Sequence, residues 1–114
     1  MELLFLLNRL NPDMVLLDIS MPNLRGIETA RQIKMKYPRI KILIVTMHKE
    51  REYLYEAISA GVEGYLLKED AEKELFSAIE RIREGKGFVS PIIIGELEES
   101  KDLMEGVFKF VLDK

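Results

Sequence analysis

The chain has 114 residues, the length of a single domain, and 47% of them are hydrophobic and 32% charged, which is close to ordinary globular usage. The 17 basic residues are spread among 20 acidic ones, and the net charge is −3. No basic block suited to nucleic acid is present, so we expect no direct DNA binding by this chain. The absence of cysteine excludes disulfides and thiolate metal sites, and the cytoplasm is the expected compartment.

Residues 1–10 predict a buried helix and not a signal peptide or a membrane span. Glu2 stands where a signal peptide carries basic residues, and Arg9 interrupts an apolar stretch that is also too short to cross a membrane. Pro12 ends this helix, because proline cannot continue a helix and restricts the residue before it.

Apolar runs then alternate with amphipathic segments. The runs 14–17, 42–45 and 64–67 lack the period-2 pattern of a half-exposed strand, which predicts strands covered on both faces. Helices are predicted at 27–37, at about 50–60, and between Asp70 as the cap and Gly85. The strands lie about 25 residues apart, too far for hairpins, which predicts an α/β fold with a parallel sheet and right-handed crossovers. A last helix is predicted from a Ser90-Pro91 cap through Val111.

Each predicted strand ends at a different reactive side chain: Asp18, Thr46 and Lys68. Parallel strands end along one edge of a sheet, where such sheets hold their ligands, so we expect the three groups to lie together. A carboxylate can attack phosphorus, a lysine and a hydroxyl can bind phosphoryl oxygens, and Lys68 would favour the ionised form of Asp18. Taken singly, each residue also has a structural explanation as a turn former, a strand-end threonine or a surface lysine. Tyr65 is expected to be half-buried packing.

Three motifs in order carry a family resemblance: DISMP at 18–22 with Gly26, ILIVTMH at 42–48 and AGVEGYLLK at 60–68. Together they resemble the receiver domain of two-component response regulators, in the form found in the NarL/LuxR-type subfamily. The resemblance covers about residues 2–91 and implies a CheY-like (flavodoxin-like) fold.

The resemblance also implies roles for individual residues. Asp18 matches the phospho-acceptor, Thr46 the switch hydroxyl, Lys68 the phosphate contact and Tyr65 the switch aromatic. Asp18 and the backbone carbonyl of Ser20 match ligands of Mg²⁺. The acidic pair that supplies the family's other metal ligands is missing from this sequence, which makes a poor hard-cation site.

The sequence begins at what resembles the second helix of a receiver, which predicts a sheet of about three strands. We expect a partial receiver domain at 1–91, a helical extension at 92–114 and no DNA-binding output domain. The strand that ends at Asp18 then forms a sheet edge without protective lysine or proline. We expect a homodimer or an element swap through this edge, with the segment from Ile92 onward as one candidate to cover it.

The leading hypothesis is a signalling module, not an enzyme, that accepts a phosphoryl group on Asp18 from a histidine kinase and then changes its protein contacts. The alternative is a truncated receiver that cannot be phosphorylated and acts by dimerisation or protein binding. An enzyme with an aspartate nucleophile, such as a phosphatase, is disfavoured because Ser20 stands where a second acid would be needed. His48 is expected to be a solvated loop residue.

Overall fold

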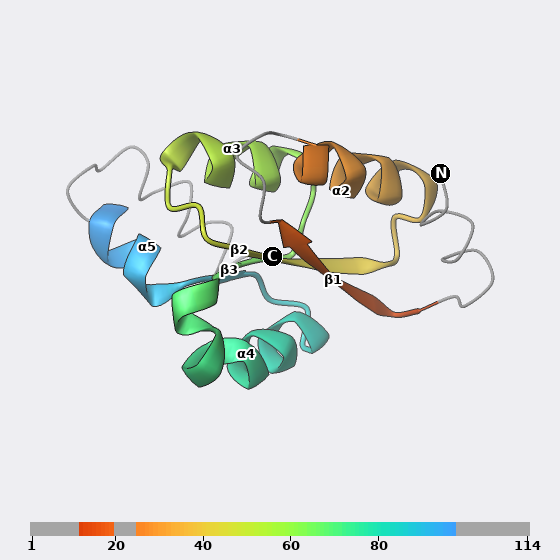
Figure 1. The fold of residues 1–114 in the computed structure, drawn as a ribbon. Helices are drawn as coiled ribbons and strands as arrows, with labels where there is room; N and C mark the ends of the chain where they lie inside the picture. Colours follow the sequence, from red (N-terminus) through yellow and green to blue (C-terminus); the bar gives the residue numbers. More distant parts are fainter. Residues whose placement is uncertain (1–11, 20–24, 98–114) are drawn as a thin grey trace.

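The computed structural model describes residues 12–19 and 25–97, which form alternating strands and helices (Figure 1). Four parallel strands form one sheet in the order β1-β2-β3-β4. They are β1 (Met14–Ile19), β2 (Lys41–Thr46), β3 (Gly64–Leu67) and β4 (Phe88–Val89). The helices are α2 (Arg25–Lys36), α3 (Arg51–Ser59), α4 (Lys68–Arg83) and α5 (Pro91–Leu97). The predicted α/β class is confirmed, with one strand more than the sequence indicated.

The sheet divides the apolar core into two layers, as the unalternating strand runs require. Figure 1 shows α2 and α3 on one face and α4 on the other. The larger cluster includes Ile33 of α2, Ile44 of β2 and Ala57 of α3, all fully buried. The smaller cluster includes Leu66 of β3 and Ile82 of α4. Strands β2 and β3 are largely buried on both faces, which requires apolar residues at successive positions and explains their continuous runs. The prediction that the run 14–17 is covered on both faces is wrong, because β1 lies at an edge of the described sheet and Leu16 is 47% exposed.

Two glycines end helices as predicted. Gly61 follows α3 with φ of 93°, and Gly85 follows α4 with φ of 86°, a left-handed conformation that glycine adopts without steric cost. The predicted cap of α4 is wrong. The helix begins at Lys68 directly after β3, with the extended Leu67 as its cap residue, so Asp70 lies in the first turn.

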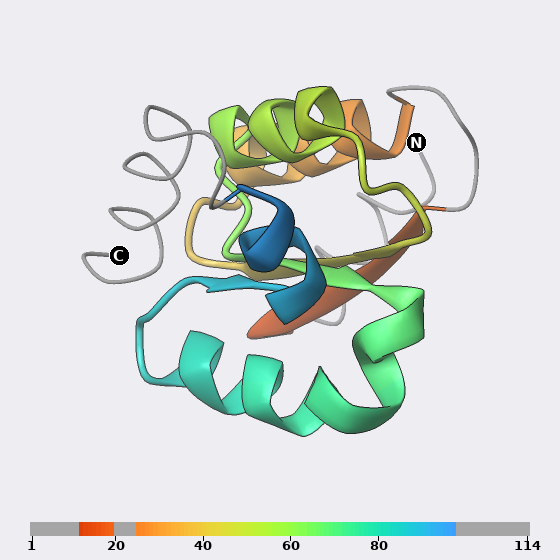
Figure 2. The same cartoon turned by 90° about the vertical axis from the view of Figure 1, so that its left-hand side faces the viewer.

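The segment from Ile92 onward, which was a candidate helix or strand to cover the edge of β1, is helical where the structure describes it. Residues 92–94 belong to α5, and Ile93 is buried in the larger cluster, so they form no strand against β1. Figure 2 looks along the sheet from its carboxyl-end side, with α5 in front.

The predicted helix at 1–10, Ser20 and the continuation beyond Leu97 lie outside the described residues. None of the described helices is long and apolar enough to cross a membrane.

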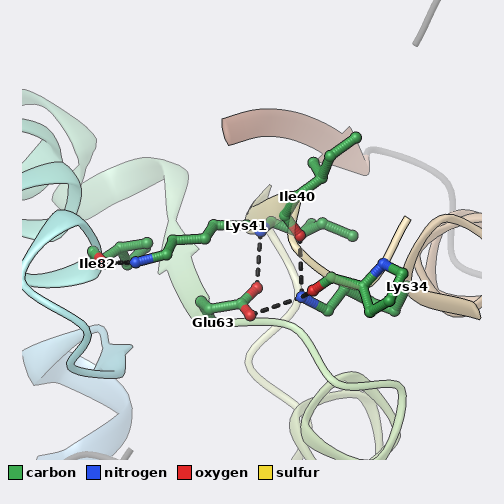
Figure 3. Close-up of polar contacts among 7 residues, drawn as sticks. Lys34, Ile40, Lys41, Glu63 and Ile82 are labelled. Atoms are coloured by element: carbon green, nitrogen blue, oxygen red, sulfur yellow. Dashed lines mark hydrogen bonds and ion pairs between the residues drawn. The ribbon is translucent and has the colours of Figure 1, made fainter. Parts of the chain in front are cut away.

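A polar network ties the amino ends of β2 and β3 to α2 (Figure 3). Lys34 Nζ of α2 lies 2.7 Å from Glu63 Oε2 and donates to the carbonyl oxygen of Ile40 at 2.9 Å. Glu63 Oε1 accepts a hydrogen bond of 2.8 Å from the backbone N–H of Ile42. Both charged side chains are part-buried, so each depends on the other to balance its charge.

Replacing Glu63 with glutamine should lower the free energy of unfolding by about 2 kcal/mol, because it removes the charge facing the part-buried Lys34 ammonium. Urea unfolding followed by circular dichroism measures this change. The matched control is Glu80→Gln, which breaks an exposed pair with Arg83 and should change stability by less than about 0.5 kcal/mol. Equal effects of the two substitutions would contradict a stabilising role for the network.

Candidate functional site

The three predicted residues lie at the carboxyl ends of the strands. Asp18 is the next-to-last residue of β1, Thr46 ends β2, and Lys68 follows β3 as the first residue of α4. In the sheet register Thr46 pairs with Ile19 on one side and with Leu67 on the other. Asp18 therefore lies one residue before this row and Lys68 one residue after it, so the structure confirms that they share one edge.

Asp18 and Lys68 form an ion pair across the end of β2. Lys68 Nζ lies 3.0 Å from Asp18 Oδ1, although their strands are not neighbours and lie about 10 Å apart, twice the spacing of adjacent strands. The long lysine side chain spans this gap. The Asp18 side chain is 64% exposed and that of Lys68 36% exposed, so the pair contributes little to stability and the carboxylate is open to an approaching reactant.

Thr46 lies beside this pair with its hydroxyl directed into the following loop. The residue is buried, and its Oγ1 accepts a hydrogen bond of 3.1 Å from the backbone N–H of His48. A threonine hydroxyl that bonds an amide two residues later stabilises a tight turn. The hydroxyl oxygen is therefore held at the edge as the acceptor of one local hydrogen bond.

Tyr65 is fully buried, not half-buried as the sequence suggested. Its hydroxyl donates a hydrogen bond of 2.8 Å to the backbone carbonyl of His48. Burial raises the pKa of the Tyr65 phenol, and the charges of Glu50 and Tyr53 raise it further. The phenol consequently stays protonated and remains a donor at any ordinary pH.

His48 is the residue that the sequence analysis missed. Its backbone N–H bonds Thr46 and its carbonyl bonds Tyr65. Its side chain is 15% exposed, with Nδ1 3.7 Å from Glu50 Oε2, and its ring stacks on Tyr53 with centroids 4.8 Å apart. The prediction of a solvated loop residue is therefore wrong. The aromatic residue in the first turn of α3 was the available signal, but sequence spacing alone does not bring it onto His48.

Replacing Tyr65 with phenylalanine should lower the free energy of unfolding by about 1 kcal/mol, since the His48 carbonyl loses its donor while the ring is retained. The pKa of Tyr65 is raised only in the folded protein. The difference in unfolding free energy between wild type and Tyr65→Phe should therefore be constant below pH 10.0, the ordinary tyrosine pKa, and should shrink above it as the phenol ionises in the unfolded wild-type chain. Urea unfolding at several pH values measures both effects. Tyr55→Phe, at an exposed tyrosine, is the control. If Tyr65→Phe lowered the free energy of unfolding no more than Tyr55→Phe does, the assigned hydrogen bond would be contradicted.

The described residues do not make a divalent-cation site. Among them no group of three or more His, Cys, Asp or Glu side chains is placed to hold a metal. Asp18 contributes one carboxylate, which already faces Lys68, while Ser20 lies outside the described residues. Mg²⁺ requires near-octahedral oxygen coordination, so the donors among the described residues do not fit it.

Comparison with known proteins decides the family. The response regulator receiver domain family matches residues 1–80. This chain belongs to that family. The parallel sheet with helices on both faces is accordingly the CheY-like fold of a receiver domain, and the resemblance drawn from the three motifs is confirmed.

The receiver domain is similar to LuxR/NarL-type regulators. It is 33% identical to the transcriptional regulatory protein DegU of Brevibacillus brevis over 92 residues, which is 81% of this chain and 39% of DegU. A two-component response regulator of the LuxR family from Aurantimonas sp. SI85-9A1 has a TM-score of 0.79 at 36% identity, covering 88% of this chain and 71% of that one.

RcsB structures are similar as well. The isolated REC domain of RcsB from Salmonella enterica serovar Typhimurium, in the presence of the phosphomimetic BeF3⁻, has a TM-score of 0.71 at 28% identity and covers 84% of this chain and 71% of that one. A structure of two RcsB dimers bound to two parallel DNAs has a TM-score of 0.70 at 26% identity and covers 91% of this chain and 50% of that one. The chain spans about two fifths of the length of its curated relatives, 39% for DegU and 44% for YxjL of Bacillus subtilis.

Proposed function

We propose that this receiver domain accepts a phosphoryl group on Asp18 from a histidine kinase and transmits the signal by changing its protein contacts. The observation that carries the proposal is the exposed carboxylate held 3.0 Å from Lys68 at the carboxyl ends of the strands. A carboxylate oxygen of Asp18 would form the new bond to phosphorus as the bond from phosphorus to the kinase histidine nitrogen breaks, and that nitrogen keeps the electron pair. The domain is a substrate of this transfer and has no enzymatic role of its own.

Lys68 and Thr46 are assigned to the oxygens of the transferred group. The Lys68 ammonium would balance their negative charge. Thr46 would turn its hydroxyl from the backbone N–H of His48 toward a phosphoryl oxygen, as a donor. Losing that bond would release the His48 loop on one side, while Tyr65 still holds its carbonyl on the other. This local exchange of partners is the proposed switch.

Mg²⁺ is the cofactor that receiver domains typically bind, and we infer that this chain binds it weakly. The described residues offer one carboxylate at the site, already paired with Lys68, and no cluster of three ligating side chains. Titration with Mg²⁺, followed by the chemical shift of the Asp18 amide, should therefore require high metal concentrations.

Incubation with acetyl phosphate tests the proposed phosphorylation. Intact-mass spectrometry should show the gain of one phosphoryl group, removable by hydroxylamine as expected of an acyl phosphate. Peptide mapping should place the group on Asp18, and parallel samples with Mg²⁺ or EDTA measure its metal dependence. An unmodified mass in both samples would favour the alternative, a receiver that acts by protein binding alone.

A second proposal concerns the outer edge of β1. Among the described strands, β1 pairs with β2 alone, and Leu16 in the middle of β1 is 47% exposed. An unprotected strand edge tends to pair with another chain, and RcsB is dimeric in its DNA-bound structure. We therefore propose a homodimer or an element swap through this edge.

Multi-angle light scattering over a range of concentrations should show a dimer that dissociates on dilution. Leu16→Lys, which places a charge at the middle of the edge, should shift the protein to monomer, because charged edge residues oppose strand pairing. Met35→Lys is a matched control, since Met35 is also exposed but lies on α2. A monodisperse wild-type monomer at all concentrations would contradict the proposal.

The remaining assignments follow from the same features. We propose a receiver portion at 1–91 and a helical extension at 92–114, supported by the start of α5 at Pro91. The cytoplasm is the proposed compartment, supported by the cysteine-free composition. The net charge of −3 favours protein partners over direct DNA contact by this chain.

A further inference from the structure

Ser90 is a fully buried polar residue whose backbone N–H, backbone carbonyl and side-chain Oγ all form hydrogen bonds. Its backbone N–H donates to the Tyr65 carbonyl at 3.0 Å. Its side-chain Oγ accepts a hydrogen bond of 2.7 Å from the backbone N–H of Leu67. Its own carbonyl accepts from the N–H groups of Ile93 and Ile94 at 3.0 and 3.1 Å, which begins α5.

The Ser90 hydroxyl accepts a hydrogen bond that a backbone carbonyl would accept if β4 continued alongside β3. Strand β4 ends at Val89, which is in register with Tyr65. If the parallel ladder continued, the Leu67 N–H would donate to the Ser90 carbonyl. That carbonyl has instead turned into α5, which would leave a buried N–H unpaired at considerable cost. The side-chain oxygen takes the place of the carbonyl, a role that the cap predicted from the sequence did not include.

The bonded amide lies directly beside the candidate site. Leu67 is the cap residue of α4 and precedes Lys68, whose ammonium pairs with Asp18. Tyr65, on the other side of Leu66, is bonded by the backbone of the same Ser90. Ser90 therefore holds the end of β3, which carries Tyr65 and leads directly into Lys68.

We propose that Ser90 is a positioning residue for Lys68 and the junction through which the site is coupled to α5. A displacement of Lys68 moves the Leu67 amide, which pulls on the Ser90 hydroxyl, and Ser90 in turn holds the first turn of α5 through its carbonyl. The helix lies at the same end of the sheet as the site (Figure 2). The relevance of this coupling to signalling rests on the proposed phosphorylation of Asp18, whereas the coupling itself does not.

Amide hydrogen exchange measured by NMR on the full chain tests the first step. Ser90→Ala and Ser90→Cys should each raise the exchange rate of the Leu67 amide by about tenfold, because neither supplies a good acceptor, while Ser90→Thr retains the hydroxyl and should retain the protection. Ser90→Cys separates loss of the acceptor from loss of volume. Ile33→Val, a core change in α2, controls for general destabilisation and should not single out Leu67. Unchanged exchange at Leu67 in both hydroxyl-free variants would overturn the proposal.

The coupling is tested without phosphorylation by adding Lys68→Met. In the wild-type background this change should alter exchange at Ile93 and Ile94, and in the Ser90→Ala background it should not. Equal responses in the two backgrounds would refute the junction.

Acetyl phosphate then connects the coupling to function. The Ser90→Ala variant should be phosphorylated about tenfold more slowly than wild type, whereas Ser90→Thr and Ile33→Val should be phosphorylated at the wild-type rate. This result is expected if the hydroxyl positions Lys68, the group that stabilises the phosphoryl charge. A wild-type rate in Ser90→Ala would overturn the positioning role. If wild type takes up no phosphoryl group, the proposed function fails, and the exchange measurements still decide the role of Ser90.

Discussion

Replacing Asp18 with asparagine should abolish the mass gain that acetyl phosphate produces in the wild-type protein. The amide is neutral and has no anionic oxygen to attack phosphorus. The fold should survive the change, because the Asp18 side chain is 64% exposed and its pair with Lys68 is a surface ion pair worth at most about 1 kcal/mol. Intact-mass spectrometry and urea unfolding of the same samples separate loss of the acceptor from loss of structure.

Asp13→Asn is the matched control for this experiment. Asp13 is exposed and lies immediately before β1, at the opposite end of the strand from Asp18. Its substitution makes the same chemical change away from the carboxyl ends of the strands, so phosphorylation should proceed at the wild-type rate. Full phosphorylation of Asp18→Asn would place the acceptor elsewhere and overturn the proposed function.

The strands and helices that the sequence predicted are those whose signals are local. Each of the apolar runs 14–17, 42–45 and 64–67 lies within a strand, and in β2 and β3 burial on both faces accounts for the apolar residues. Strand β4 escaped prediction because it has two residues, Phe88 and Val89, too few for a periodic pattern. It exists because β3 offers a free edge, with Val89 in register with Tyr65, a tertiary cause.

The same distinction applies to the site. Asp18, Thr46 and Lys68 could be placed at one edge because topology alone brings strand ends together. The positions of His48 and Ser90 could not be predicted, since each depends on a distant partner. The His48 carbonyl accepts a hydrogen bond from Tyr65 of β3, 17 residues later, and the Ser90 hydroxyl accepts one from an amide of β3, 23 residues earlier. Residues that connect elements carry no periodic signal in the sequence.

Replacing Lys68 with methionine should lower the rate of phosphorylation by acetyl phosphate about 100-fold, the scale expected for removing one charge-stabilising donor from a reaction site. Methionine keeps a long apolar stem but lacks the ammonium 3.0 Å from Asp18. Lys68→Arg keeps the charge but changes its shape and reach, so its rate should fall between the two. Initial rates from quenched samples, resolved by intact mass, measure all three proteins.

Lys49→Met is the control that gives this comparison its meaning. Lys49 pairs with Glu69 at 2.9 Å, the residue next to Lys68, so its loss changes the surface charge near the site by the same amount without touching Asp18. If Lys68 acts only by raising the local concentration of the anionic phosphodonor, both substitutions should slow the reaction similarly, and added salt should remove the difference from wild type. If Lys68 binds the transferred group, Lys49→Met should react at nearly the wild-type rate and the defect of Lys68→Met should persist in high salt. A wild-type rate for Lys68→Met would show that the pair across β2 has no part in the transfer.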